Sequence, residues 1–209
     1  MKKLKLLIPL IILLGIGIRC KQDSSILDPI EYKRWIENPT NGLCVKKKVG
    51  NFEYIAQFKP SDYIVVQEEK QKTLNTSLVE ERKAALGDES YYFNLRIKTI
   101  DKAASPLTFE LSSEQAYQDR LGYFVYDMQQ DLYLLQNEDT IYCTLYNFAR
   151  NYETAPFLDF ALAFSNGNKI NLKEDFTFIL EDKKLGTGII KMNFEKNNLL
   201  NTPVLKTIE

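Results

Sequence analysis

The feature that most restricts the fold is a succession of short aromatic and β-branched runs in the second half of the chain. Such residues favour strands. In the clearest run every second residue is large and apolar: Leu158, Phe160, Leu162 and Phe164. This predicts a strand that buries these four side chains on one face and places the residues between them on the other. This periodicity is typical of an antiparallel sheet. The predicted strands cover residues 123–128, 131–135, 140–150, 157–164, 176–180 and 188–194.

The first half mixes helical and strand patterns. Asp28 followed by Pro29 predicts a capped helix over residues 28–37. Gly50-Asn51 separates two apolar runs, 43–49 and 52–58, which predicts a β-hairpin. Its charge run, Lys46 to Lys48, is interpreted as a solvated or edge-protecting stretch rather than a contact with lipid or glycan.

Two further helices and another strand follow the hairpin. Pro60 opens a predicted helix that extends to Lys70, and the capping-box pattern from Ser77 to Glu80 opens a second over residues 77–86. Phe93, Leu95 and Ile97 alternate with polar residues and predict a strand with one buried face.

A short strand at 107–111 and a helix from the Ser112–Gln115 capping pattern to Leu121, ending at Gly122, complete the first half. The tail, 198–209, is expected to be a loop. We therefore predict one α+β domain over residues 28–209, a largely antiparallel sheet with two to four helices on one face.

Histidine is absent from the 209 residues. Its absence excludes Ser-His-Asp and Cys-His nucleophilic catalysis and imidazole zinc sites. The sequence also has no glycine-rich phosphate loop, CxxC pair or basic–aromatic interleaving, so no cofactor, metal site or nucleic-acid partner is predicted.

The first twenty residues have the pattern of an export signal. Lys2, Lys3 and Lys5 precede an apolar run, 6–18, that is shorter than the roughly 20 residues needed to span a bilayer. Arg19 and Cys20 follow the run, and the segment Gly17–Cys20 resembles the lipobox signals of bacterial lipoproteins. That resemblance implies removal of residues 1–19, acylation of Cys20 and a tether over 20–27. Gly17 stands where the family usually has leucine, and Arg19 where it usually has a small residue. The large, charged Arg19 is unfavourable for efficient cleavage before Cys20. The alternatives are an uncleaved anchor or an ordinary signal with a chance cysteine.

The resemblance also implies a cellular location. Lys21, rather than aspartate, follows Cys20, which by the sorting rules of these lipoproteins favours the outer membrane, with the bilayer as partner. Removing residues 1–19 would leave 23 basic and 28 acidic residues, a net charge of −5.

The segments Phe58–Tyr63 and Tyr146–Tyr152 are similar to uncharacterised envelope lipoproteins of Bacteroidetes-type bacteria. The expected function is a non-enzymatic binding or accessory subunit of a cell-envelope assembly.

Two other functions are weighed against it: a surface carbohydrate- or ligand-binding lipoprotein, and a carboxylate-dependent hydrolase. A hydrolase would need two carboxyl groups on either side of one bond. The acids that turns could bring to one sheet end are Asp127, Asp131, Glu138 and Asp139, which are also candidates for Ca²⁺ binding. Acids in turns are more often structural.

Other candidate residues have mainly structural interpretations. Arg150, at the end of a predicted strand, could bind a carboxylate or hold a loop. Cys44 and Cys143 could form a disulfide or remain buried thiols. A group of tyrosines could stack on sugar rings, although such residues more often fill a core: 91, 92, 117, 123, 126, 133, 142, 146 and 152.

Overall fold

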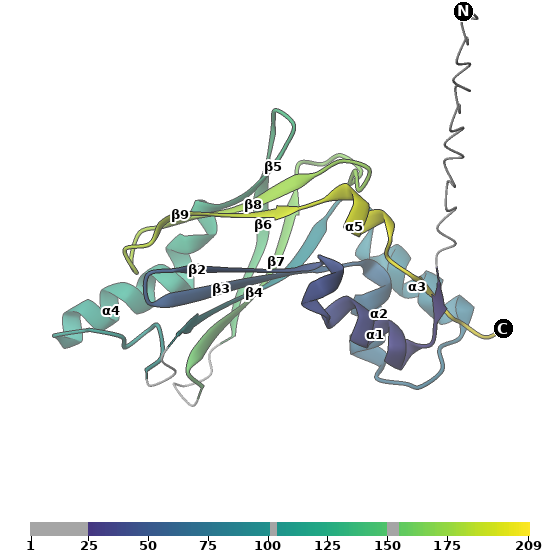
Figure 1. Cartoon of the computed structure of the whole chain (residues 1–209), viewed down its shortest axis with the longest axis horizontal. Coiled ribbons are helices and arrows are strands. Elements are labelled where there is room, and N and C mark those ends of the chain that lie inside the picture. Colours follow the sequence, from purple (N-terminus) through teal and green to yellow (C-terminus); the bar gives the residue numbers. More distant parts are fainter. Residues whose placement is uncertain (1–24, 101–103, 150–154) are drawn as a thin grey trace, which may run out of the picture.

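A single antiparallel sheet organises the protein (Figure 1). The computed structural model describes residues 25–100, 104–149 and 155–209. Eight strands of these residues form the sheet in the order β2-β3-β4-β7-β6-β5-β8-β9. Their bounds are β2 Cys44–Val49, β3 Phe52–Lys59, β4 Tyr91–Thr99, β5 Leu132–Gln136, β6 Asp139–Ala149, β7 Phe157–Ser165, β8 Phe176–Asp182 and β9 Gly188–Phe194. The predicted α+β class is confirmed.

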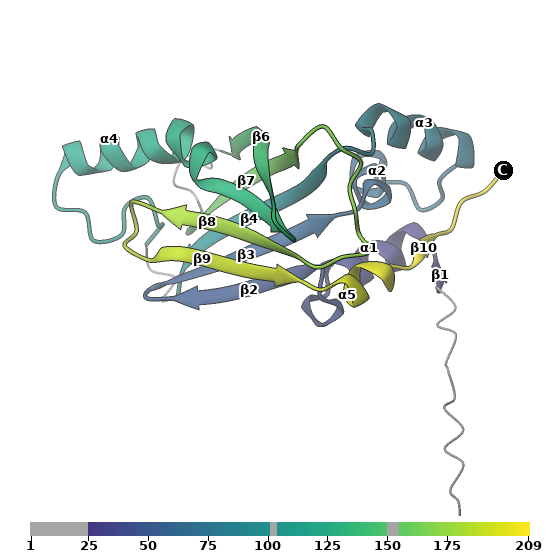
Figure 2. The ribbon, with the colours of Figure 1, turned by 90° about the horizontal axis from the view of Figure 1, so that it is seen from above.

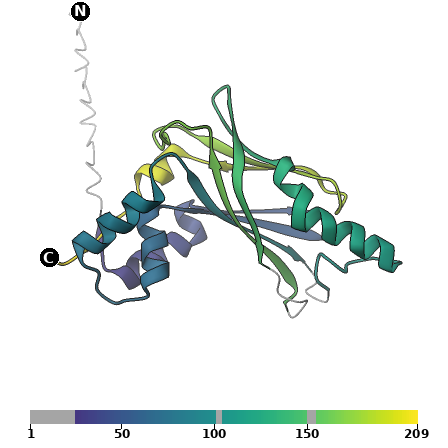
Figure 3. The same cartoon turned by 180° about the vertical axis from the view of Figure 1, so that it is seen from behind.

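The helices divide between the two ends of the sheet rather than sharing one face. Figures 1 and 2 show α1, α2 and α3 together at one end and α4 at the opposite end, and Figure 3 shows the same division from behind. A parallel two-stranded ladder of β1 and β10 lies beside α1. The bounds are β1 Ile26–Leu27, α1 Pro29–Glu37, α2 Ser61–Glu69, α3 Thr76–Leu86, α4 Glu114–Gly122, α5 Lys196–Leu200 and β10 Val204–Leu205.

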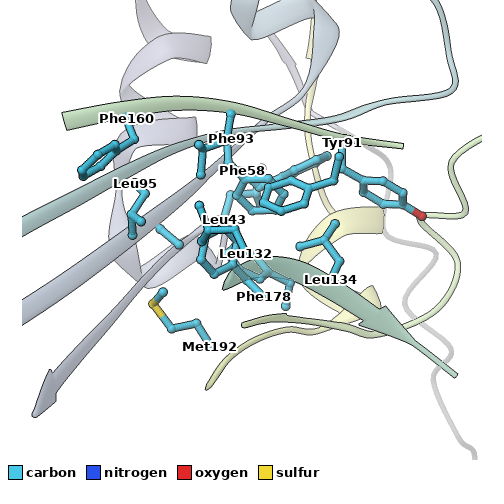
Figure 4. Close-up of a cluster of buried hydrophobic side chains, with 14 of the residues drawn as sticks. Leu43, Phe58, Tyr91, Phe93, Leu95, Leu132, Leu134, Phe160, Phe178 and Met192 are labelled. Carbon is cyan, nitrogen blue, oxygen red and sulfur yellow. The ribbon is translucent and has the colours of Figure 1, made fainter. Parts of the chain in front are cut away.

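The sheet curls until the inner faces of its two halves meet. Phe93 of β4 contacts Phe178 of β8 and Phe194 of β9, with ring centroids 5.2 and 5.3 Å apart. These strands are far apart in the order of the sheet, so only strong curvature can bring the rings together. Figure 4 shows Phe58, Phe93 and Phe178 gathered in this core. The interior is therefore filled by side chains, as expected for a barrel of about eight strands.

The two edge strands of the curled sheet, β2 and β9, face each other without a backbone ladder in the described residues. Their Cα atoms approach within 8 Å, and Lys47 Nζ donates to the backbone oxygen of Lys191 at 3.2 Å. An inserted strand would need two spacings, about 9.5 Å. Each edge strand therefore leaves no room for a strand of another molecule to pair with the other edge. Lys47 contributes to this protection, in agreement with the edge-protecting interpretation of the charge run Lys46 to Lys48.

Helix caps explain where α1 and α3 begin. Asp28 Oδ1 accepts from the backbone N–H groups of Ile30 and Glu31, both at 2.9 Å, as predicted. In α3 the cap is Asn75 rather than Ser77, because the Asn75 side chain accepts from the N–H groups of Ser77 and Leu78. The capping-box pattern located the helix, but the amide one position before Thr76 sets its start.

The region around α4 differs most from the sequence prediction. Residues 106–110 form turns, so the strand predicted over 107–111 is not formed. α4 ends at Gly122, as predicted, but the chain stays helical: Gly122 has φ −56° and ψ −45°, and a π-helical turn, η2 (Tyr123–Asp127), and a 3₁₀ turn, η3 (Met128–Asp131), follow. The predicted strand 123–128 is therefore wrong. Helical turns place Tyr123 and Phe124 together, and the Phe124 ring packs on inward-facing Phe160 at 6.0 Å.

Two more local differences follow from tertiary contacts. A bulge between Cys143 and Leu145 reverses the alternation of β6, so Tyr146 and Phe148 turn toward Phe160 and Leu145 is exposed. The tail is not a plain loop. It forms α5 and β10, because β10 pairs with β1.

Buried tyrosines allow a direct test of hydrogen bonding in the core. The Tyr91 hydroxyl donates to Gln136 Oε1 and accepts from the Asn171 N–H, both at 2.8 Å. The hydroxyl of fully buried Tyr32 has no hydrogen-bond partner among the described residues. We expect Tyr91→Phe to lower the free energy of unfolding by about 1–3 kcal/mol, whereas Tyr32→Phe leaves it unchanged or raises it by up to about 1 kcal/mol. Urea unfolding of the two variants measures this, and equal destabilisation by both would contradict it.

Candidate functional site

A pocket of about 320 Å³ opens at the α4 end of the sheet. Three segments distant in sequence surround it: the β2–β3 turn, the β8–β9 turn, and the stretch from Phe109 into α4. Figures 1 and 2 show both turns at this end. The lining residues are Val49, Gly50, Asn51, Phe52, Phe109, Glu110, Arg120, Leu185, Gly186 and Thr187.

Arg120 of α4 fixes one wall of the pocket. Its Nη1 donates to the backbone oxygens of Pro106 at 3.0 Å and Phe109 at 2.7 Å. These bonds hold the preceding turn against the helix, and the Phe109 ring then meets the Phe52 ring edge-on at 5.2 Å. Burial lowers the pKa of Arg120, although the guanidinium remains cationic at neutral pH. The pocket therefore has a positive group anchored in its wall.

A second wall is a turn organised by Asp182. The Asp182 carboxylate accepts from the N–H groups of Lys184 at 3.0 Å, Leu185 at 2.9 Å and Thr187 at 2.8 Å, and from the Thr187 hydroxyl at 2.9 Å. Thr187 Oγ1 lies 2.6 Å from the Tyr54 hydroxyl. Since threonine has one hydroxyl proton, already directed at Asp182, Tyr54 is the donor in this second bond. Burial raises the pKa of Tyr54, which keeps it protonated for that role.

The pocket has the chemistry of a binding surface rather than of an acid–base site. Its lining offers one cation, Arg120, and one carboxylate, that of exposed Glu110, whose backbone lies in the left-handed region at φ 50°. Two opposed carboxylates, which glycoside hydrolysis requires, do not line it. Among the described residues, no group of three or more Cys, Asp or Glu side chains is placed to hold a metal ion.

The structure does not bring the four candidate acids together. Asp127 and Asp131 precede β5, whereas Glu138 and Asp139 follow it. The five residues of β5 rise by about 3.3 Å each, so the two pairs are roughly 17 Å apart. The expectation that these acids converge at one sheet end is wrong, because β5 lies between the two pairs and places them at its opposite ends.

Asp131 has a structural role instead. It is 6 % exposed and pairs with Lys183 of the β8–β9 turn, so it joins η3 to that turn. The pKa of Tyr123 is raised mainly because the side chain is buried, and further because the negative Asp131 carboxylate lies beside it. Asp127, Glu138 and Asp139 are exposed.

Cys44 and Cys143 are both buried free thiols, so the disulfide that the sequence left open is not formed here. Three strands separate β2 from β6 in the order of the sheet. Burial raises the pKa of both thiols, that of Cys143 to about 12. Buried thiols of this kind behave as small apolar core residues.

The tyrosines are mostly structural. Tyr92 donates to the Leu86 carbonyl at 2.9 Å and Tyr133 donates to Glu181 Oε1 at 2.8 Å. Tyr133 and Tyr142 are cross-strand partners, and Tyr142 is exposed, as is Tyr126 of η2. Cys20, Arg150 and Tyr152 lie outside the described residues.

The fold and the pocket define a class: an α+β protein with a strongly curled antiparallel sheet and a small open pocket at one end. Comparison with protein-family models, with curated proteins and with solved structures finds no match for this chain. In the part of the chain that the structure describes, no helix has the length and apolar character needed to cross a membrane.

Proposed function

We propose that this protein is a lipid-anchored cell-envelope protein that acts as a binding or accessory subunit of an envelope assembly. The observation that carries the proposal is the position of Cys20. Only Arg19 separates it from a short apolar run, and only five residues lie between it and the first strand, which starts at Ile26. Two or three acyl chains on Cys20 would provide stable anchoring, where one chain would be marginal.

The arrangement of the fold supports this function. β1, where the tether would join the folded body, lies at the α1–α3 end, and the pocket lies at the α4 end (Figures 1 and 2). An anchor at the first end therefore leaves the second end accessible to partners. Since the four candidate acids are separated, and the pocket lining has one carboxylate, binding is favoured over hydrolysis.

Metabolic labelling with an alkyne analogue of palmitate tests the anchor. We expect the full chain to incorporate label and to fractionate with membranes. Cys20→Ala should abolish both, because Cys20 supplies the acylated sulfur. Cys143→Ala is the matched control: its thiol is buried, so the label should persist in this variant.

Label that persists in Cys20→Ala would overturn the anchored function. The binding role is tested separately by crosslinking the labelled protein in intact cells. A subunit should be recovered with other envelope proteins, whereas recovery only as a lone monomer would contradict this part of the proposal.

A further inference from the structure

The ladder of β1 and β10 has an exposed apolar side. Ile26 and Val204 are direct partners in the parallel pairing, and they are 66 % and 51 % exposed. Beyond Val204 the extended tail alternates, with Leu205 buried and Lys206 and Ile208 exposed. We call Ile26, Val204 and Ile208 the apolar strip.

Exposed apolar residues are concentrated at this end of the molecule. Ten large apolar side chains of the described residues are highly exposed, and five of them belong to β1, α1, α5, β10 or the tail: Ile26, Ile30, Leu200, Val204 and Ile208. Single exposed apolar residues need no explanation. A group that includes directly paired residues marks a surface for a partner or a membrane.

We infer that the apolar strip lies against the lipid bilayer, so that the protein stands on the membrane with its α4 end outward. This inference rests on the proposed anchor at Cys20. Six residue steps separate Cys20 from Ile26, and an extended chain spans at most about 3.6 Å per residue, or roughly 22 Å in all. An acylated Cys20 therefore keeps the strip close to the lipid headgroups, and no other part of the described fold is joined to so short a tether.

The charges around the strip are balanced, which makes the contact apolar rather than electrostatic. Three exposed basic residues, Lys33, Arg34 and Lys206, lie near the strip. Three exposed acidic residues accompany them: Asp28, Glu31 and Glu209. A long lysine side chain can place its methylenes along an apolar surface and its ammonium group among headgroups. The contact should therefore persist at high salt and on uncharged phosphatidylcholine.

The test places a polarity-sensitive fluorophore on the acylated full chain in phosphatidylcholine vesicles. Lys206→Cys puts the probe inside the strip while retaining its three apolar residues. Ser112→Cys is the matched control, an exposed position just before α4 at the opposite end. Labelling under native conditions is selective because Cys44 and Cys143 are buried and the pKa of each is raised.

We expect the probe at position 206 to shift to the blue and to be quenched several-fold more by brominated lipid than the probe at 112, at both low and high salt. Equal, weak quenching at both positions would overturn the orientation. A blue shift at 206 that brominated lipid does not quench would also overturn it, because a second copy of the chain would then cover the strip.

Failure of the anchor gives a different result, since the protein would not float with the vesicles at all. Ile26→Asp combined with Val204→Asp provides a second variant. Both side chains are exposed, so the fold should persist by circular dichroism and the protein should still float. Quenching at 206 should nevertheless fall several-fold, and unchanged quenching would contradict the role of the strip.

Discussion

Replacing Phe93 with alanine is expected to lower the free energy of unfolding by about 4 kcal/mol, the upper part of the range for large-to-small core changes. Phe93 is 1 % exposed. Its ring contacts five others, from β3, β7, β8 and β9, at centroid distances from 5.2 to 6.0 Å. Alanine would remove three of the ring contacts between the two halves of the curled sheet, those to Phe176, Phe178 and Phe194, and leave a cavity that a rigid aromatic cluster cannot fill.

Urea unfolding followed by circular dichroism measures the effect, with Tyr126→Ala as the control. Tyr126 is also a large aromatic residue, but it is 72 % exposed, so its removal should change stability by less than about 0.5 kcal/mol. A Phe93→Ala variant as stable as Tyr126→Ala would contradict the inward curvature of the sheet, because Phe93 would then lack its partners from β8 and β9.

The strands could be predicted largely from periodicity, whereas their curvature could not. Leu158, Phe160, Leu162 and Phe164 are all buried, as their alternation predicted. Nothing in that alternation says that β8 and β9 fold back over β3 and β4, because the meeting of distant strands depends on twist accumulated across the whole sheet.

The failed strand at 123–128 has a similar cause. Tyr123 and Phe124 have high β-propensity, but a helical turn buries both, and tertiary packing prevails over local preference. The grouping of the candidate acids failed for a separate reason: residues before and after one strand lie at its opposite ends, so β5 separates Asp127 and Asp131 from Glu138 and Asp139. Asp131 pairs with Lys183 instead.

The pocket could not be found from sequence because its walls come from three separate segments. A local signal existed for one wall. Asp182 precedes Gly186 and Gly188 in a turn-rich stretch, and aspartate commonly accepts hydrogen bonds from N–H groups just after it. Arg120 gave no such signal, since its partner Phe109 lies in a segment that was predicted as a strand and Pro106 lies just before that segment.

The second large effect is expected at Gly42, a residue between α1 and β2 that packs against Asn198 of α5. Gly42 has φ +80°, and an added Cβ would lie 2.8 Å from Asn198 Cβ and still closer to its amide group. Two costs should combine in Gly42→Ala: left-handed strain of about 1–2 kcal/mol, and a steric displacement of α5 that costs about 1–3 kcal/mol. We expect the free energy of unfolding to fall by about 3 kcal/mol.

Gly167→Ala separates these two costs. Gly167 has the same φ of +80°, but an added Cβ there meets nothing within 4 Å, so only the left-handed strain of about 1–2 kcal/mol should appear. Asn198→Ala, combined with Gly42→Ala, should recover about 1 kcal/mol in a double-mutant cycle, because it removes the amide that the new methyl group strikes. Equal losses in Gly42→Ala and Gly167→Ala, with no coupling to position 198, would show that α5 does not pack against Gly42. The Gly42 and Asn198 variants therefore measure how strongly packing at α5 holds the C-terminal segment against the fold. That segment continues into β10 and the apolar strip.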